Sequence, residues 1–232
     1  MKLYKLTDGD GQTWGGTQWG PGVSHSGTGK GELCGPGWIH AYEHPLVAVL
    51  MNPIHAHFKN PRLWEAEGEI AIRDGQLKCG CKALTTIREI PLPAITAEMR
   101  VRFAILCARE ALTAADAACK AWNAWADKWL SGEDRSAAAA AKADAAAAKA
   151  AYDAAGAVGP AAYDAAAWAA EAAEAAAASA YAAYRASWAA ARSVQWAAQA
   201  AASSAYQSTR AAACCGMDLV AIAENACHSG LT

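Results

Sequence analysis

Apolar and polar residues alternate in several short stretches of the first 93 residues. Residues 2–6 alternate in this way and are followed by the turn-forming run Asp8-Gly9-Asp10-Gly11, so they predict a strand. Residues 38–42 predict a second short strand. Residues 63–72 alternate bulky and acidic side chains, and residues 76–90 predict one or two further strands. A strand-rich segment therefore opens the chain.

One helix is predicted among these strands. Pro45 is favoured at the first position of a helix and precedes the apolar residues 46–50. The glycine-rich segment 9–37 predicts loops and tight turns. Together the elements predict an α+β protein in which residues 1–93 form a small mixed α/β head.

A long helix is predicted after Pro91-Leu92-Pro93. Thr96 is a suitable N-cap, and Gly132 is a suitable stop, so the sequence predicts one helix that runs to Leu130. Apolar residues recur along it in steps of four and three, a period of 3.5 that forms a narrow stripe for partner helices. The stripe consists of Val101, Ile105, Ala108, Leu112, Ala115, Cys119, Trp122, Ala126 and Trp129.

Alanine dominates the rest of the chain. Residues 137–213 contain 44 alanines in 77 residues, so helices are predicted there, with caps at Asp134 or Ser136 and a break at Gly156 to Pro160. Asp218 caps a last short helix, residues 219–227. We expect residues 94–232 to form an alanine-rich antiparallel bundle or helical hairpins. A wetter face repeats every seven residues at Asp164, Glu171, Ala178, Arg185, Arg192, Gln199 and Tyr206, and the opposite face is almost pure alanine.

Charge and composition argue against two classes of binding partner. The net charge of −2 provides no basic excess for phosphates, so nucleic-acid binding is not expected. The alanine-rich helices lack a Leu, Phe or Ile face opposite a basic face, so membrane binding is not expected. No apolar leader follows Lys2, and we expect a cytoplasmic protein with reduced cysteines. Cys79 and Cys81, on one face of a predicted strand, are interpreted as structural thiols.

Two motifs are candidates for chemistry. His40-Ala41-Tyr42-Glu43-His44 matches the H-x-x-E-H order of inverted zinc peptidases, but that chemistry needs a helix, and Pro45 disfavours helical torsions at His44. Gly27-Thr28-Gly29-Lys30-Gly31 lacks the spacing of a phosphate-binding loop. We therefore predict no catalytic residue, no metal ligand and no cofactor.

An ordered set of segments within residues 2–106 resembles an uncharacterised phage and prophage family. Its members carry an α/β head and a repetitive tail rich in Ala and Ser, and the resemblance implies no known activity. The segments are Lys2-Leu3-Tyr4-Lys5, Cys34 to His40 with Pro45, Leu63 to Gly68, Lys78-Cys79 and Ile87-Arg88-Glu89-Ile90.

A second similarity concerns the fold alone. A strand with Tyr4, followed by a Gly-x-x-His strand end at His40, is similar to the start of ADP-ribosyltransferase-like domains, but no later catalytic Glu motif follows. Two hypotheses result. The first is a non-enzymatic phage accessory protein, cytoplasmic in a bacterial host or associated with the virion, that binds a protein partner or itself through its alanine-rich helices. The alternative is a small-ligand or nucleotide site in the head at Tyr4, His40 and Tyr42.

Overall fold

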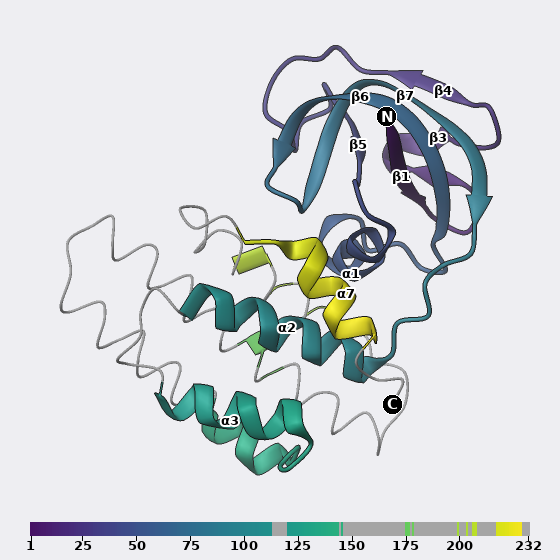
Figure 1. Ribbon diagram of the computed structural model, residues 1–232. Coiled ribbons are helices and arrows are strands. Elements are labelled where there is room, and N and C mark those ends of the chain that lie inside the picture. The colour runs from purple at the N-terminus through teal and green to yellow at the C-terminus, as the bar shows by residue number, and fades with distance from the viewer. Residues whose placement is uncertain are drawn as a thin grey trace, which may run out of the picture. The chain divides into compact units, whose positions relative to one another are not determined.

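The chain divides into two compact units, Met1–Ala94 and Ile95–Thr232, which we call the head and the helical unit. The computed structural model (Figure 1) describes residues 1–112, 120–143, 145, 175–176, 178, 199, 203, 206–207 and 217–228. The head contains an antiparallel sheet and one α-helix, and the described part of the helical unit contains helices, so the predicted α+β class is confirmed. None of the described helices is both long enough and apolar enough to cross a bilayer.

The head is built on a long hairpin of two curved strands (Figure 1). Its elements are β1 (Lys2–Thr7), β2 (Gln12–Thr13), η1 (Trp14–Gly16), β3 (Thr17–Gln18), β4 (Ser24–Ser26), β5 (Ile39–Ala41), α1 (Pro45–His55), β6 (Arg62–Asp74) and β7 (Lys78–Ile90). The hairpin joins β6 and β7, and Gly75 at its turn has a φ of 52°, a conformation that glycine adopts without steric cost. β1 pairs with the outer edge of β6, whereas β4 and β5 pair with the outer edge of β7.

The strands close on themselves through one isolated bridge. The amide of Tyr4 donates to the Tyr42 carbonyl at 2.8 Å, and the amide of Tyr42 donates back at 2.9 Å. This bridge links the end of β5 to β1, so the path β1–β6–β7–β5 returns to β1. The buried side chains inside include Leu3, Trp19, Ala41, Ala66, Cys79, Cys81 and Leu84.

The predicted strands and the predicted helix of the head are confirmed with small shifts of their ends, but the prediction of loops and turns alone for residues 9–37 is wrong, because β2, β3 and β4 lie there and pair with other strands. The predicted strands correspond to β1, β5, β6 and β7, and Pro45 is the first residue of α1. The helix continues past residue 50 to His55, and its residues Val47 to Met51 are buried. Figure 1 shows α1 at one end of the strands.

In the helical unit, three described helical segments begin at the predicted caps Thr96, Ser136 and Asp218. The helices of this unit include α2 (Ala97–Leu112), α3 (Lys120–Ser131) and α7 (Leu219–His228). The hydroxyl of Thr96 accepts a bond from the Met99 amide at 3.1 Å, and the carboxylate of Asp218 accepts one from the Ala221 amide at 3.0 Å. Ser136 caps the helical segment that follows, because its hydroxyl accepts a bond from the Ala139 amide at 3.2 Å.

The prediction of one continuous helix to Leu130 is wrong. Arg102 donates to the Leu130 carbonyl at 3.3 Å, although a single straight helix would hold these residues about 42 Å apart, and Glu98 and Arg135 form an ion pair at 2.8 Å. Arg109 and Asp127 are likewise paired at 3.1 Å, so α2 and α3 run antiparallel and side by side. The physical reason lies in the stripe itself, because its aliphatic half packs against its tryptophan half. Leu112, Ala115 and Cys119 have side chains outside the described residues.

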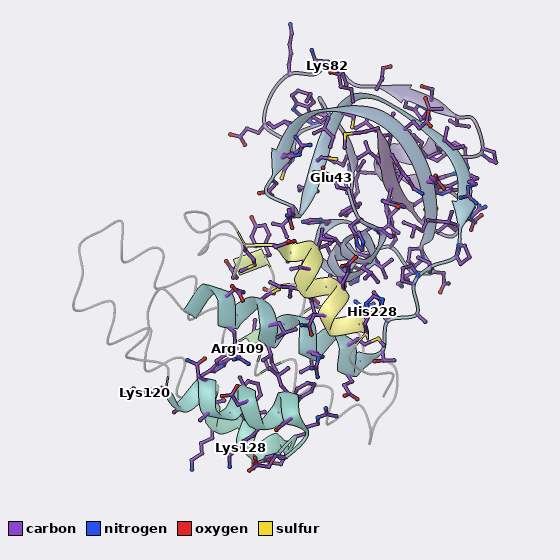
Figure 2. All side chains as sticks on the ribbon, viewed as in Figure 1. Glu43, Lys82, Arg109, Lys120, Lys128 and His228 are labelled. Atoms are coloured by element: carbon purple, nitrogen blue, oxygen red, sulfur yellow. The ribbon has the colours of Figure 1, made fainter. Side chains whose placement is uncertain are left out.

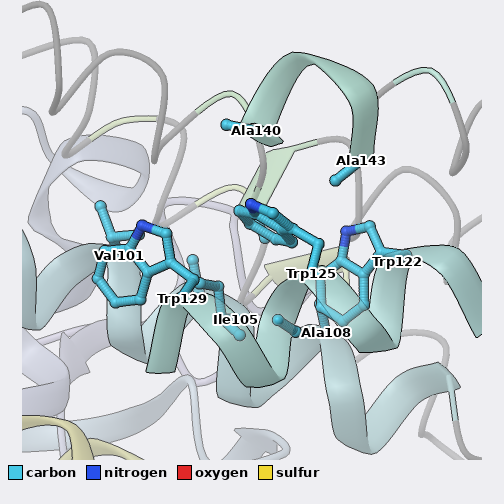
Figure 3. Packing of buried hydrophobic residues seen from close by; sticks show 11 residues of the cluster. Val101, Ile105, Ala108, Trp122, Trp125, Trp129, Ala140 and Ala143 are labelled. Carbon is cyan, nitrogen blue, oxygen red and sulfur yellow. The ribbon is translucent and has the colours of Figure 1, made fainter. Parts of the chain in front are cut away.

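The core of the helical unit combines tryptophan with alanine (Figure 3). Trp122 and Trp125 meet edge to face, with centroids 5.5 Å apart and an interplanar angle of 62°. Their cluster also contains Val101, Ile105, Ala108, Trp129, Ala140, Ala143 and Ala176. Alanines therefore make room for the large rings. α7 packs on α2 elsewhere in this unit. The predicted break at 156–160 and most of the seven-residue repeat lie outside the described residues.

Enlarging an alanine in this core should destabilise the protein. Ala176 is fully buried in the tryptophan cluster, whereas Ala178, two residues away, is exposed. We expect Ala176→Leu to lower the melting temperature through overpacking worth about 1–3 kcal/mol. Ala178→Leu is the matched control and should have little effect. Thermal denaturation followed by circular dichroism measures both, and equal behaviour of the two variants would contradict the packing described here.

Candidate functional site

Tyr4, His40 and Tyr42 lie together where β1 meets β5. Tyr4 and Tyr42 are the two residues of the bridge that closes the strands, and His40 lies within β5. Tyr42 is buried, His40 and Tyr4 are half-buried, and the Lys2 ammonium lies 5.7 Å from the centre of the Tyr4 ring. The three predicted residues therefore share one seam of the head, which we call the β1–β5 seam.

The polar groups of His40 and Tyr42 already have partners inside the head. A ring nitrogen of His40 contacts the Leu33 carbonyl oxygen. The Tyr42 hydroxyl and Nδ1 of His55 are 3.2 Å apart, and the two rings stack with centroids separated by 5.8 Å. These contacts hold both side chains in the fold.

Burial keeps the Tyr42–His55 pair neutral. It raises the pKa of Tyr42 far above its usual range, and it lowers the pKa of His55 to about 3, with the positive charge of Lys78 adding to the effect. Nε2 of His55 is buried without a hydrogen-bond partner among the described residues. A proton on His55 would therefore add an unpaired buried charge.

A buried lysine that the sequence motifs did not indicate lies beside the seam. Lys5 is only 7% exposed, and its ammonium donates to the His40 carbonyl at 2.7 Å and lies 4.9 Å from the centre of the Trp19 ring. No carboxylate pairs with it in the described part of the chain. Burial lowers the pKa of Lys5 to about 8. The available signal was the alternation of β1, which places Lys5 on the same side as the buried Leu3.

The cysteines next to Lys5 are fully buried, as expected of structural thiols, but they are electrostatically unequal. The Cys79 thiol lies 3.4 Å from the Ala41 carbonyl oxygen, to which it donates. The interaction between the two thiols raises the pKa of Cys79 and lowers that of Cys81, and the charge of Lys5 also lowers the pKa of Cys81. Lys5 thus stabilises negative charge on Cys81 inside the head.

The residues of the two motifs singled out in the sequence have structural roles in the head. His44 has extended backbone angles of −137° and 138° just before α1, so it shares no helix with His40, as Pro45 predicted. The amide of Gly27 donates to the Lys82 carbonyl and that of Gly29 to the Gly37 carbonyl, each at 2.8 Å. No set of three or more potential metal-ligating side chains comes together in the described ranges.

A surface hollow of about 550 Å³ lies elsewhere on the head, over the β6–β7 hairpin. Glu67, Glu69, Lys82 and Thr85 contribute to its walls, and none of Tyr4, His40 and Tyr42 borders it. The register of the hairpin shifts at this place, between Gly68 and Ile72. Bulges of this kind re-aim side chains.

Comparison with protein-family models, curated proteins and solved structures finds no match to this chain. The resemblance to a phage and prophage family therefore stays a prediction.

Replacing Lys5 should change how the free energy of unfolding depends on pH in alkaline solution. Its pKa is about 8 in the folded protein and 10.5 ordinarily, so between these values the unfolded chain binds more protons and the free energy of unfolding rises with pH. We expect a rise of roughly 3 kcal/mol across this window, absent in Lys5→Met. Urea denaturation at the two ends measures it. The exposed Lys59→Met variant is the control, and a rise that persists in Lys5→Met would contradict this role.

Replacing His55 should change how the free energy of unfolding depends on pH in acid solution. Its pKa is about 3 in the folded protein and 6.5 ordinarily, so below pH 6.5 the unfolded chain takes up a proton that the native state refuses, and stability falls as the pH falls. His55→Phe keeps a stacked ring and should make this fall shallower. Acid titration followed by tryptophan fluorescence tests it. Lys59→Met, at an exposed position, is the control and should leave the slope unchanged.

Proposed function

We propose that this protein is a non-enzymatic accessory protein of a phage or prophage that binds a partner protein or further copies of itself through its alanine-rich helices. The supporting observation is the burial of alanine in the helical unit. Ala140, Ala143 and Ala176 are 1%, 3% and 0% exposed against the tryptophan cluster. An alanine face of this chain can therefore form a packed contact with another surface.

The alanine content of the tail favours further contacts of the same kind. A helix with so little apolar bulk is marginal alone and needs a neighbour. Ala138, Ala141 and Ala145 follow one another at spacings of three and four residues, and all three are exposed. They lie on one face of the segment that buries Ala140 and Ala143 on its other side. This exposed face has the composition of the buried one.

The chemistry of the head supports the non-enzymatic part of the proposal. The side chains of His40, Tyr42 and Lys5 are bonded within the head, and the bond from Lys5 to the His40 carbonyl joins β1 to β5. Substrate would have to compete with these contacts for each group.

A ligand-binding head is the second candidate function. The observation that favours it is the hollow over the β6–β7 hairpin, whose volume of about 550 Å³ is in the range of small-molecule sites. A phosphate cradle at Gly27 to Gly31 is not favoured, because the amides of Gly27 and Gly29 are bonded to backbone carbonyls.

Association through the alanine helices predicts a concentration-dependent assembly. In sedimentation velocity of the full chain, we expect the mean sedimentation coefficient to rise with protein concentration. Ala141→Glu places a charge on the exposed alanine face and should shift the distribution toward the monomer by roughly tenfold in dissociation constant. Ala178→Glu, exposed on the predicted wetter face, is the matched control and should behave as the unmodified protein.

A monomer at every concentration would contradict self-association. Site-specific photo-crosslinking from position 141 in phage-infected host cells then tests the remaining form of the proposal. If no protein adduct depended on that position, the association function would be wrong.

A further inference from the structure

Three charged side chains at the hollow of the β6–β7 hairpin have no partner among the described residues. They are Glu67, Glu69 and Lys82, and all are exposed. Glu67 and Glu69 lie two residues apart on β6, so they project from the same side of the strand. Lys82 comes from β7 at the level of Glu69.

Most of the other charged residues of this hairpin are paired, and Asp74, at the hairpin turn, is the exception among the described residues. Glu65 binds Arg88 at 2.7 Å and Lys2 at 3.1 Å. Glu89 binds Arg62, and Arg73 binds Glu43 at 2.9 Å. Lys78 donates to the Cys34 sulfur at 3.1 Å. Of the five basic residues between positions 62 and 90, Lys82 is the one without such a contact in the described structure.

The backbone explains why Lys82 does not neutralise Glu69. Opposite charges on facing strands normally pair. Here Gly68 pairs with Leu84 and Ile70 with Cys81, so β7 has an extra residue opposite Glu69. The stem of Lys82 is also held by the glycine-rich loop, since a Cβ added to Gly29 would come within 2.9 Å of its Cγ and Cε. Lys82, labelled in Figure 2, therefore lies on the outer surface of the head with its stem over that loop.

The lining of the hollow also contains small residues. Gly68, Ala71 and Ala83 line it together with Met1, whose N-terminal ammonium donates to the Gly68 carbonyl at 3.0 Å. Thr85 also lines the hollow, and its hydroxyl donates to Ser24 at 3.1 Å. The hollow therefore combines small residues with carboxylates and an ammonium in one lining.

The spacing of the carboxylates selects among cations. Residues two apart on a strand are separated by about 6.6 Å, a span that a compact ammonium does not bridge. A planar guanidinium presents five N–H donors in a fork and can bond to two carboxylates at once. The ammonium of Lys82, which has no partner among the described residues, complements an anionic group on the same ligand.

We propose that this hollow binds a ligand with a guanidinium and a carboxylate on one aliphatic stem, an arginine either free or at the C-terminus of a peptide. The guanidinium lies between Glu67 and Glu69, and the carboxylate lies against Lys82. The inference rests on the second candidate function, a ligand-binding head, and is independent of helical association. Because all the charged groups are exposed to water, we expect a dissociation constant of roughly 1 mM.

Amide chemical shifts of the full-length protein test the proposal. The probes are L-arginine, an acetylated tripeptide that ends in arginine, the C-terminal amide of that peptide, and L-citrulline, which lacks the positive charge. We expect shifts at Gly68 and Thr85 with L-arginine or the acid peptide, and binding at least roughly tenfold weaker with citrulline. The acid peptide binding more tightly than the free amino acid would identify a peptide terminus as the ligand.

Two variants test the contacts of the guanidinium and of the carboxylate separately. Glu67→Gln with Glu69→Gln should weaken arginine binding by roughly tenfold or more, because it removes both acceptors of the guanidinium. Lys82→Met keeps the stem over Gly29 and should weaken the acid peptide to the level of its amide. Glu32→Gln, an exposed glutamate away from the hollow, is the control. Thermal melts establish that each variant is folded.

Each result decides the question. Arginine binding that survives the double glutamate substitution, or equal binding of citrulline, would overturn the proposal. A nucleotide that shifted Gly68 and Thr85 while L-arginine did not would also overturn it, yet would leave the ligand-binding head in place. Absence of shifts with every probe, including a nucleotide panel, would contradict both.

Discussion

The antiparallel bridge between Tyr4 and Tyr42 is the contact on which the head depends. It is made of two backbone hydrogen bonds, at 2.8 and 2.9 Å, and it joins residues far apart in the chain. Lys5 reinforces it, because its ammonium reaches the carbonyl of His40 across the same seam at 2.7 Å. Without this closure β1 would be an open edge, and open edges invite pairing with other chains.

Closure also sets the chemistry of the interior. A buried ammonium without a carboxylate partner is costly, and the carbonyl of His40 together with the face of Trp19 offsets part of the cost. The same charge favours a thiolate at Cys81. His55 is kept neutral by burial next to Tyr42. The head therefore couples its stability to protonation at both ends of the pH range, although its seam residues are committed to structure.

The helical unit is stabilised by pairing the largest side chain with the smallest. Trp122, Trp125 and Trp129 fill the space that Ala140, Ala143 and Ala176 leave open. Because packed interiors tolerate little excess volume, such a core has no room for larger residues. An alanine face that lacks rings of its own then needs another surface, which is the physical basis for expecting association. The hollow on the head is a separate feature, since it lies where the register of β6 and β7 shifts, and three of its charged side chains have no partner among the described residues.

The sequence by itself determined the local features of this protein. Thr96, Ser136, Asp218, Pro45 and Gly132 mark helix ends correctly, because a cap or a stop acts over three or four residues and needs no distant partner. The alternation of β1 and β6 was equally readable, since a strand with one buried face repeats every two residues. Tyr4, His40 and Tyr42 were singled out from motifs, but their partners, among them His55 and Leu33, were not predictable.

Only the tertiary structure decided the contacts between distant segments. A stripe of period 3.5 is the same whether the helix continues or folds back, so the antiparallel pairing of α2 with α3 needed the ion pairs of Glu98 with Arg135 and of Arg109 with Asp127. In the sequence Lys5 is an ordinary strand lysine, and only the closure of β1 against β5 shows that it is buried. Lys82 and Glu69 lie opposite one another in the hairpin yet remain unpaired, because a register shift and the approach of Gly29 depend on how distant backbones meet. Such contacts arise from chain geometry in three dimensions, and residue type and spacing do not encode them locally.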